Sequence, residues 1–129
     1  MATVAINGLG RIGRAALKQI LEVNELELVA VNDIVPPDNL AYMLRYDSVY
    51  GRYHKTVEAS GSDLKIDGKS IKVLNVKEPE NLPWKKMGVD IVIESTGIFT
   101  KPDDLKKHVQ AGAKHVILSA PVKGEGVDM

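Results

Sequence analysis

Three glycines near the start of the sequence have the spacing of a phosphate-binding turn. They form the pattern Gly8-x-Gly10-x-x-Gly13 directly after the apolar run Thr3 to Ile6. In such a pattern the first glycine permits a sharp turn after a strand, the second lets a pyrophosphate approach the backbone, and the third lets the following helix pack closely on the sheet. The helix start then offers N–H groups and the positive end of its dipole to the phosphates. The alternative is a glycine-rich turn that binds nothing.

The residues that flank the glycines favour the ligand-binding interpretation. The run Thr3 to Ile6 has the β-branched content and the length of a buried strand, and Arg11 to Val23 has apolar residues at helical spacing. The glycines therefore fall at a strand-to-helix turn, which is the context that a dinucleotide-binding motif requires.

An acidic residue follows the next apolar run. Asp33 comes after Leu26 to Val31, about 20 residues beyond Gly13. A carboxylate at the end of a second parallel strand accepts hydrogen bonds from the ribose hydroxyls of an adenosine and repels a 2′-phosphate. The sequence therefore predicts NAD rather than NADP as the cofactor. Capping of a helix that begins near Pro36 is an alternative role for Asp33, and the two roles are compatible.

Beyond Asp33, strands and helices alternate. Helices are predicted from near Pro36 to Tyr46 and from a Thr100 cap to about Ala111, and strands at residues 89–94 and 115–118. This order predicts an α/β fold, a Rossmann-like, doubly wound and mostly parallel sheet. Ligands of such sheets bind where strands end, which adds Ser95, Thr96, Gly97 and Ser119 to the candidate residues.

The stretch around residues 55–76 departs from this alternation. Leu64 to Ile66 and Ser70 to Leu74 flank the pair Asp67-Gly68, which is typical of a two-residue hairpin turn. We expect an antiparallel hairpin insertion here, with residues 55–59 as a third strand beside it. Nothing in its residue types indicates chemistry of its own.

The composition excludes several classes of protein. Seventeen basic and 17 acidic residues cancel, so charge gives no support for a nucleic-acid or membrane partner. No apolar stretch approaches the roughly 18 residues of a membrane span, and a strand stands where a signal peptide would begin, so we expect a cytoplasmic protein. The chain has no cysteine, and His54, His108 and His115 are too scattered for a metal site. A structural or surface role is expected for each histidine.

Four blocks of sequence together resemble the N-terminal half of glyceraldehyde-3-phosphate dehydrogenase, the phosphorylating glycolytic family. The first is the opening fingerprint Ala5-Ile-Asn-Gly-Leu-Gly-Arg-Ile-Gly-Arg14. The others are similar to family motifs in the expected order: Leu44-Arg-Tyr-Asp-Ser-Val-Tyr-Gly-Arg52, Asp90-Ile-Val-Ile-Glu-Ser-Thr-Gly-Ile-Phe-Thr100 and Ala111-Gly-Ala-Lys-His-Val-Ile-Leu-Ser-Ala-Pro121. The resemblance covers the whole chain.

The resemblance implies roles for residues at matching positions. Arg11 and Ile12 would contact the pyrophosphate, Asp33 the adenosine ribose, and Ser119 the nicotinamide end. Lys77 matches a position near the adenine where relatives often have arginine, so only its backbone contact transfers. The predicted cofactor-binding residues are Asn7, Gly8, Gly10, Arg11, Ile12, Gly13, Asp33, Lys77, Ser95, Thr96, Gly97 and Ser119.

The departure from the family concerns catalysis. In this family a cysteine attacks the aldehyde, a histidine activates the cysteine, and a hydride passes to NAD, but neither catalytic residue is found in this chain. The resemblance thus implies that residues 1–129 are an NAD-binding domain without its catalytic domain, taken from a homotetrameric parent. The alternatives are a stand-alone dinucleotide-binding or protein-interaction module, and a fragment of the related erythrose-4-phosphate dehydrogenase.

Overall fold

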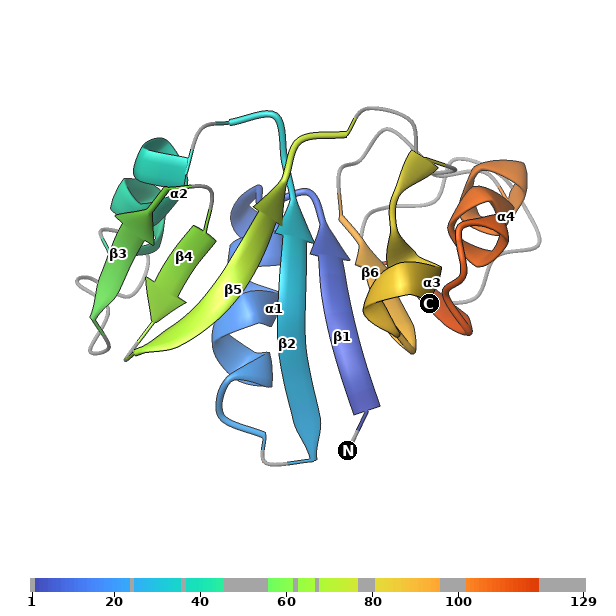
Figure 1. Cartoon of the computed structure of the whole chain (residues 1–129), viewed down its shortest axis with the longest axis horizontal. Helices are drawn as coiled ribbons and strands as arrows, with labels where there is room; N and C mark the ends of the chain where they lie inside the picture. Colours follow the sequence, from blue (N-terminus) through green and yellow to red (C-terminus); the bar gives the residue numbers. More distant parts are fainter. Residues whose placement is uncertain are drawn as a thin grey trace.

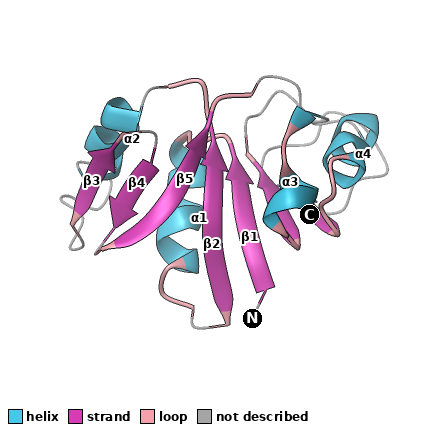
Figure 2. Cartoon of the chain, viewed as in Figure 1, coloured by secondary structure: helices cyan, strands magenta, loops and turns pink. Residues whose placement is uncertain are grey.

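The protein forms one mixed sheet with helices on both faces (Figures 1 and 2). The computed structural model describes residues 2–23, 25–35, 37–45, 56–61, 63–66, 68–76, 81–95 and 102–118. Within these residues the strands are β1 (Ala2–Asn7), β2 (Leu26–Asn32), β3 (Val57–Ser60), β4 (Asp63–Ile66), β5 (Lys69–Leu74), β6 (Ile91–Glu94) and β7 (His115–Leu118). The helices there are α1 (Arg11–Ile20), α2 (Pro37–Arg45), α3 (Trp84–Met87) and α4 (Pro102–Gln110).

The sheet has the order β3-β4-β5-β2-β1-β6-β7. The pairs β1–β2, β1–β6, β2–β5 and β6–β7 are parallel, whereas β3–β4 and β4–β5 are antiparallel. The prediction of a doubly wound, mostly parallel sheet with an antiparallel hairpin is therefore confirmed. The strand order reverses between β1 and β6, and ligands of open α/β sheets bind beside such a reversal.

The hairpin is more closely integrated than an insertion. Its second strand, β5, pairs antiparallel with β4 on one side and parallel with β2 on the other. Ile71 and Val73 of β5 are buried while Lys72 between them is exposed, so only one face of this strand is covered. Because β1, β2 and β5 pair in parallel, their arrowheads point to the same edge of the sheet (Figure 1).

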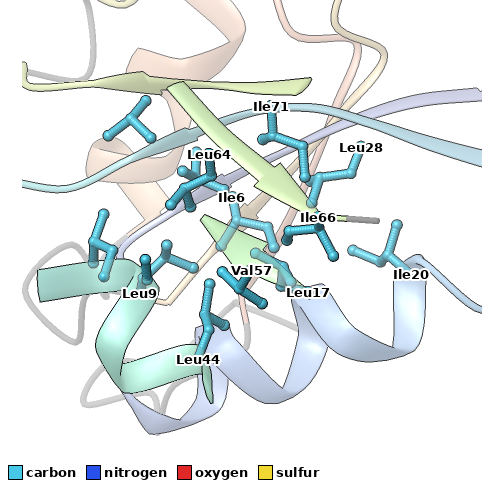
Figure 3. Packing of buried hydrophobic residues seen from close by; sticks show 14 of the residues in the cluster. Ile6, Leu9, Leu17, Ile20, Leu28, Leu44, Val57, Leu64, Ile66 and Ile71 are labelled. Carbon is cyan, nitrogen blue, oxygen red and sulfur yellow. The ribbon is translucent and has the colours of Figure 1, made fainter. Parts of the chain in front are cut away.

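Helices α1 and α2 cover one face of the sheet over the larger apolar core. Ile6 of β1, Leu28 of β2 and Ile71 of β5 meet Leu17 of α1 and Leu44 of α2 in this core (Figure 3). The opposite face has a smaller core around Trp84, where the sheet contributes the small side chains of Ala5 and Ala30. Because β1 alternates its side chains between the two cores, both of its faces are buried, as its apolar sequence predicts.

Helix α1 is shorter than its apolar pattern predicts. It ends at Ile20, and the N–H groups of Glu22 and Val23 donate to the carbonyls of Gln19 and Ile20. These i→i−3 bonds tighten the last turn so that the chain can enter β2. In the described part of the chain, no helix has the length and apolar character needed to cross a membrane.

Candidate dinucleotide-binding site

Two of the three glycines meet requirements of the fold itself. Gly8 has a φ of 95°, a conformation that side chains rarely adopt, and its N–H donates to the Asn32 carbonyl at 2.8 Å. Gly13 lies against the backbone of Gly8, because a Cβ on Gly13 would stand 2.1 Å from the Gly8 carbonyl oxygen. The turn after β1 and the close approach of α1 thus each require a glycine, as the motif predicts.

Gly10 differs from the other two glycines. Its φ is −73°, which any residue can adopt, and a Cβ placed on it would meet nothing within 4 Å. It occupies the N-cap position of α1, where Ser, Thr, Asp or Asn would hydrogen-bond the helix start. No acidic residue lies in the first turn of α1. The start of this helix is thus left open to an approaching anion.

The predicted pyrophosphate contacts begin α1. Arg11 is the first residue of the helix, and Ile12 follows with a half-exposed side chain. The position of the Arg11 side chain lies outside the described part of the structure. The N–H groups of a first helical turn lack carbonyl partners within the helix, so these two residues can bind a phosphate through their backbone.

The carboxylate of Asp33 holds the glycine-rich loop in place. Its Oδ2 accepts a hydrogen bond from the Leu9 N–H at 2.7 Å, and its Oδ1 accepts one from the Val35 N–H at 3.0 Å. The second bond is a turn of the type that aspartate makes with its own backbone, two residues on. Each carboxylate oxygen has further acceptor capacity, so these bonds are compatible with a ribose contact. A ribose-binding role for Asp33 stays a prediction.

Arg14 also fixes the loop, a role that was not predicted from the sequence. Its guanidinium donates from Nη1 to the Leu9 carbonyl at 3.0 Å, so that Leu9 is held by Asp33 at its N–H and by Arg14 at its C=O. Arg14 follows Gly13 directly in the motif. The available signal was a basic residue directly after the motif, from which a long side chain can reach a carbonyl of the preceding turn.

Ser95 joins the end of β6 to the same loop. Its N–H donates to the Asn7 carbonyl at 2.9 Å, and its hydroxyl donates to the Gly8 carbonyl at 2.7 Å. The structure therefore brings the predicted residues Asn7, Gly8 and Ser95 together at the carboxyl ends of β1 and β6. The other predicted residues after strands, namely Lys77, Thr96, Gly97 and Ser119, lie outside the described residues, as do the Thr100 cap and His54.

The side chain of Asn7 points into the protein rather than toward the loop. Its Oδ1 accepts a hydrogen bond from Asn32 Nδ2 and its Nδ2 donates to Glu94 Oε1, both at 2.7 Å. Asn7 and Asn32 are 2% and 4% exposed, and Glu94 is fully buried. A contact between Asn7 and a cofactor stays a prediction, and these bonds restrict such a contact to its backbone.

Glu94, Asn32 and His108 were not identified as site residues from the sequence. Asn32, Asn7 and Glu94 are the last residues of β2, β1 and β6, and they stand opposite one another in the register of the sheet. A polar residue closing each of three apolar runs was the available signal. His108 is fully buried in α4, whereas His115 is exposed. The structural or surface role expected for each histidine stays a prediction.

The described residues contain no group of three or more His, Asp or Glu side chains that could hold a metal ion. The arrangement that they do form is a helix start open at Gly10, a tethered glycine-rich loop and a carboxylate at the end of the second strand. These features fit the phosphates and the adenosine ribose of a dinucleotide.

Known proteins resemble this chain over nearly its whole length. The family model described as "Glyceraldehyde 3-phosphate dehydrogenase, NAD binding domain" matches residues 2–102. Glyceraldehyde-3-phosphate dehydrogenase 1 of Kluyveromyces lactis is 55% identical over 124 residues, which are 95% of this chain and 38% of that protein.

Two further relatives match similar shares of this chain and of their own length. The glyceraldehyde-3-phosphate dehydrogenase of Geobacillus stearothermophilus is 51% identical, over 96% of this chain and 37% of its own length. The cytosolic enzyme of Trypanosoma brucei brucei is 45% identical, over 95% of this chain and 37% of its own length. The chain thus spans less than two fifths of these relatives, and it belongs to the family of NAD-binding domains of glyceraldehyde 3-phosphate dehydrogenase.

Proposed function

We propose that this chain is the cofactor-holding part of a phosphorylating glyceraldehyde-3-phosphate dehydrogenase. The loop Gly8 to Gly13 and the start of α1 would bind the pyrophosphate of NAD, and Asp33 would bind the adenosine ribose. NAD supplies the hydride acceptor of the reaction when it is bound. The chain contains no cysteine, so the nucleophile that attacks the aldehyde would come from a catalytic domain outside these residues.

The contrast among the three glycines is the observation that carries this proposal. The fold itself requires Gly8 for its positive φ and Gly13 for its packing, whereas nothing in the described structure requires Gly10. A residue with an ordinary φ and no neighbour gains no stability from being glycine. A ligand that passes close to the backbone of Gly10 accounts for the missing side chain.

Calorimetric titration with NAD and NADP tests the proposal. We expect the chain to bind NAD and to bind NADP more weakly, because the Asp33 carboxylate repels a 2′-phosphate. The variant Gly10→Ala should weaken NAD binding by about tenfold or more, since its methyl group occupies the path of the pyrophosphate. Its melting temperature should stay the same or rise slightly, because alanine is compatible with the backbone there.

Ala15→Ser is the matched control. Ala15 is exposed on the same helix and follows the glycine-rich loop, so this variant adds one atom to α1 at a position outside the motif and should leave NAD binding unchanged. Equal affinity of the parent chain and Gly10→Ala for NAD would contradict the proposed pyrophosphate position. Failure of the folded parent chain to bind NAD would contradict the proposal as a whole.

The activity, assembly and location of the whole enzyme are part of the same proposal. The relatives named above are all glyceraldehyde-3-phosphate dehydrogenases, which favours this substrate over erythrose 4-phosphate. Homotetrameric assembly with the catalytic domain and a cytoplasmic location are proposed with it, and the cytosolic relative of Trypanosoma brucei brucei supports the location. An assay of the full-length protein with each aldehyde phosphate separates the two substrates.

A further inference from the structure

A continuous series of buried side-chain hydrogen bonds crosses the sheet at its carboxyl edge. Asn32 Oδ1 accepts from the Val76 N–H at 2.9 Å, and Asn32 Nδ2 donates to Asn7 Oδ1. Asn7 Nδ2 donates to Glu94 Oε1, which also lies 2.7 Å from His108 Nε2. The series connects three neighbouring strands, β2, β1 and β6, to α4.

At the α4 end of this series, the contact with Trp84 fixes the tautomer of the His108 ring. Trp84 Nε1, which can only donate, lies 3.0 Å from His108 Nδ1. Nδ1 therefore accepts, and the ring carries its proton on Nε2, where it donates to Glu94. The Glu94 carboxylate consequently receives two hydrogen bonds on one oxygen, from Asn7 and from His108.

Asn7, in the middle of this series, adjoins the dinucleotide loop. Asn7 is the residue before Gly8, and its carbonyl accepts the Ser95 N–H while its side chain is held by Asn32 and Glu94. Ser95, the residue after Glu94, donates its hydroxyl to the Gly8 carbonyl. A shift of the Glu94 side chain would therefore move Asn7, and the turn at Gly8 would move with it.

A purely structural core would not favour this arrangement. Burying a carboxylate is costly, and apolar residues of similar volume in place of a buried polar pair often maintain or raise stability. The fully buried carboxylate and imidazole stand where the strands that form the loop end. Their location indicates a role in geometry rather than in stability alone.

We propose that Glu94 and His108 are positioning residues of the cofactor site: through Asn7 they hold the Gly8 turn in the geometry that binds the dinucleotide. The proposal rests on the NAD-binding function proposed above for this loop. Neither residue needs to touch the cofactor. His108 orients Glu94, Glu94 orients Asn7, and Asn7 fixes the start of the loop.

The double variant Glu94→Leu/His108→Leu separates positioning from stability. It removes the buried carboxylate together with its partner, so no charge is left buried and the chain should fold. The Asn7 side-chain amide and the Trp84 N–H nevertheless lose their acceptors. We expect the Kd for NAD to rise about tenfold, which corresponds to the loss of one buried hydrogen bond, together with shifted NMR signals of the Gly8 and Leu9 amides in the free chain.

Two further variants are controls. His108→Gln keeps a donor that can reach Glu94, and it should restore the amide signals and bring the Kd to within roughly twofold of the parent value. His115→Leu makes the same kind of change at an exposed histidine in β7 and should alter neither measurement. The free energy of unfolding of the parent chain and of these variants is followed by the fluorescence of Trp84, the only tryptophan of the chain, and that of any variant at Trp84 itself is followed by circular dichroism.

Each outcome bears on the proposal. A double variant with unchanged Kd for NAD would overturn it, and so would a Kd that simply follows stability across all variants. If the parent chain binds no NAD, the proposed function fails. The NMR signals of the Gly8 and Leu9 amides in the free chain then still show whether Glu94 and His108 position the loop.

If the double variant does not fold, Trp84→Phe takes its place, because it removes the donor that orients His108. A rise of about threefold in its Kd supports the proposal and an unchanged Kd contradicts it.

Discussion

The two edges of the sheet are held together by different means. At the carboxyl edge, β1 and β6 are joined by the fully buried Glu94 carboxylate and by Asn7, which is 2% exposed. At the amino edge, the Thr3 N–H donates to Asp90, and Asp90 pairs with Lys114 at 3.3 Å. The side chains of Lys114 and Asp90 are 75% and 31% exposed, so water can replace either partner.

This difference shows where the molecule needs a single geometry. Buried polar groups are costly to leave unsatisfied, so a buried network permits few alternative arrangements, whereas an exposed ion pair contributes little stability and tolerates movement. The rigid edge is the one that contains the dinucleotide loop, whereas Thr3, Asp90 and Lys114 lie at the opposite ends of the strands. Substitutions at the two edges should therefore differ in size and in their effect on NAD binding.

The largest effect is expected for Gly13→Ala at the carboxyl edge. The new methyl group would lie 2.1 Å from the Gly8 carbonyl oxygen and 2.8 Å from Ser95 Oγ, so the loop and α1 must separate. We expect a loss of about 4 kcal/mol in the free energy of unfolding together with the loss of NAD binding. Denaturant unfolding and calorimetric titration measure the two effects. Gly10→Ala is the control, and similar stability of the two variants would contradict the packing argument.

Asn32→Ala should be the next most destabilising change. It removes three hydrogen bonds and leaves the Val76 N–H, the Val76 carbonyl and Asn7 Oδ1 without the partner they have now. Because Asn32 is 4% exposed, water replaces these bonds poorly, and we expect a cost of about 2 kcal/mol in denaturant unfolding. The Kd for NAD should also rise. A cost within error of zero would mean that the carboxyl edge is no more rigid than the amino edge.

The sequence predicted the parts of this edge that have a periodic or spaced signal. The apolar runs predicted the parallel strands, and the glycine spacing predicted the turn and the close contact that Gly8 and Gly13 make. The rule that ligands bind at the ends of strands placed Ser95 beside the loop. These features depend on local sequence and on general properties of parallel sheets.

The buried network could not be predicted in the same way. Asn7 is far from Glu94 and His108 in the sequence, and the three side chains meet only because β1 lies beside β6 and α4 packs near them. Their hydrogen bonds depend on the side-chain geometry of the folded state, which has no period in the sequence. Likewise, the pairing of β5 with β2 depends on the strand order of the whole sheet, so the pattern of the hairpin alone did not reveal it.

At the amino edge, Thr3→Val should have a smaller effect than Asn32→Ala. The Thr3 hydroxyl donates to the Gly88 carbonyl and accepts the Asp90 N–H at 3.0 Å, and valine of similar shape loses both bonds. Since this edge is partly exposed, water can satisfy the two backbone groups, and we expect a loss of about 1 kcal/mol or less in denaturant unfolding. The Kd for NAD should not change. A weaker affinity would show that the two edges are coupled.

The smallest effect is expected for Asp90→Asn, and its sign depends on pH. The Thr3 N–H and then the Lys114 ammonium lower the pKa of the Asp90 carboxyl below 3.8, so its folded state favours the charged form. This contribution is fully present above about pH 4 and is lost as the pH falls through the lowered pKa of the folded state. The parent chain should therefore be slightly more stable than Asp90→Asn at pH 7, and the difference should shrink below about pH 4.

Denaturant unfolding of both chains across this pH range measures the difference in stability. Lys114→Met is the control: it keeps the hydrogen bond from Thr3 to Asp90, so its loss of stability at pH 7 should be smaller than that of Asp90→Asn. A gap that widens in acid would contradict the assignment, and any change in NAD affinity would contradict the separation of the two edges.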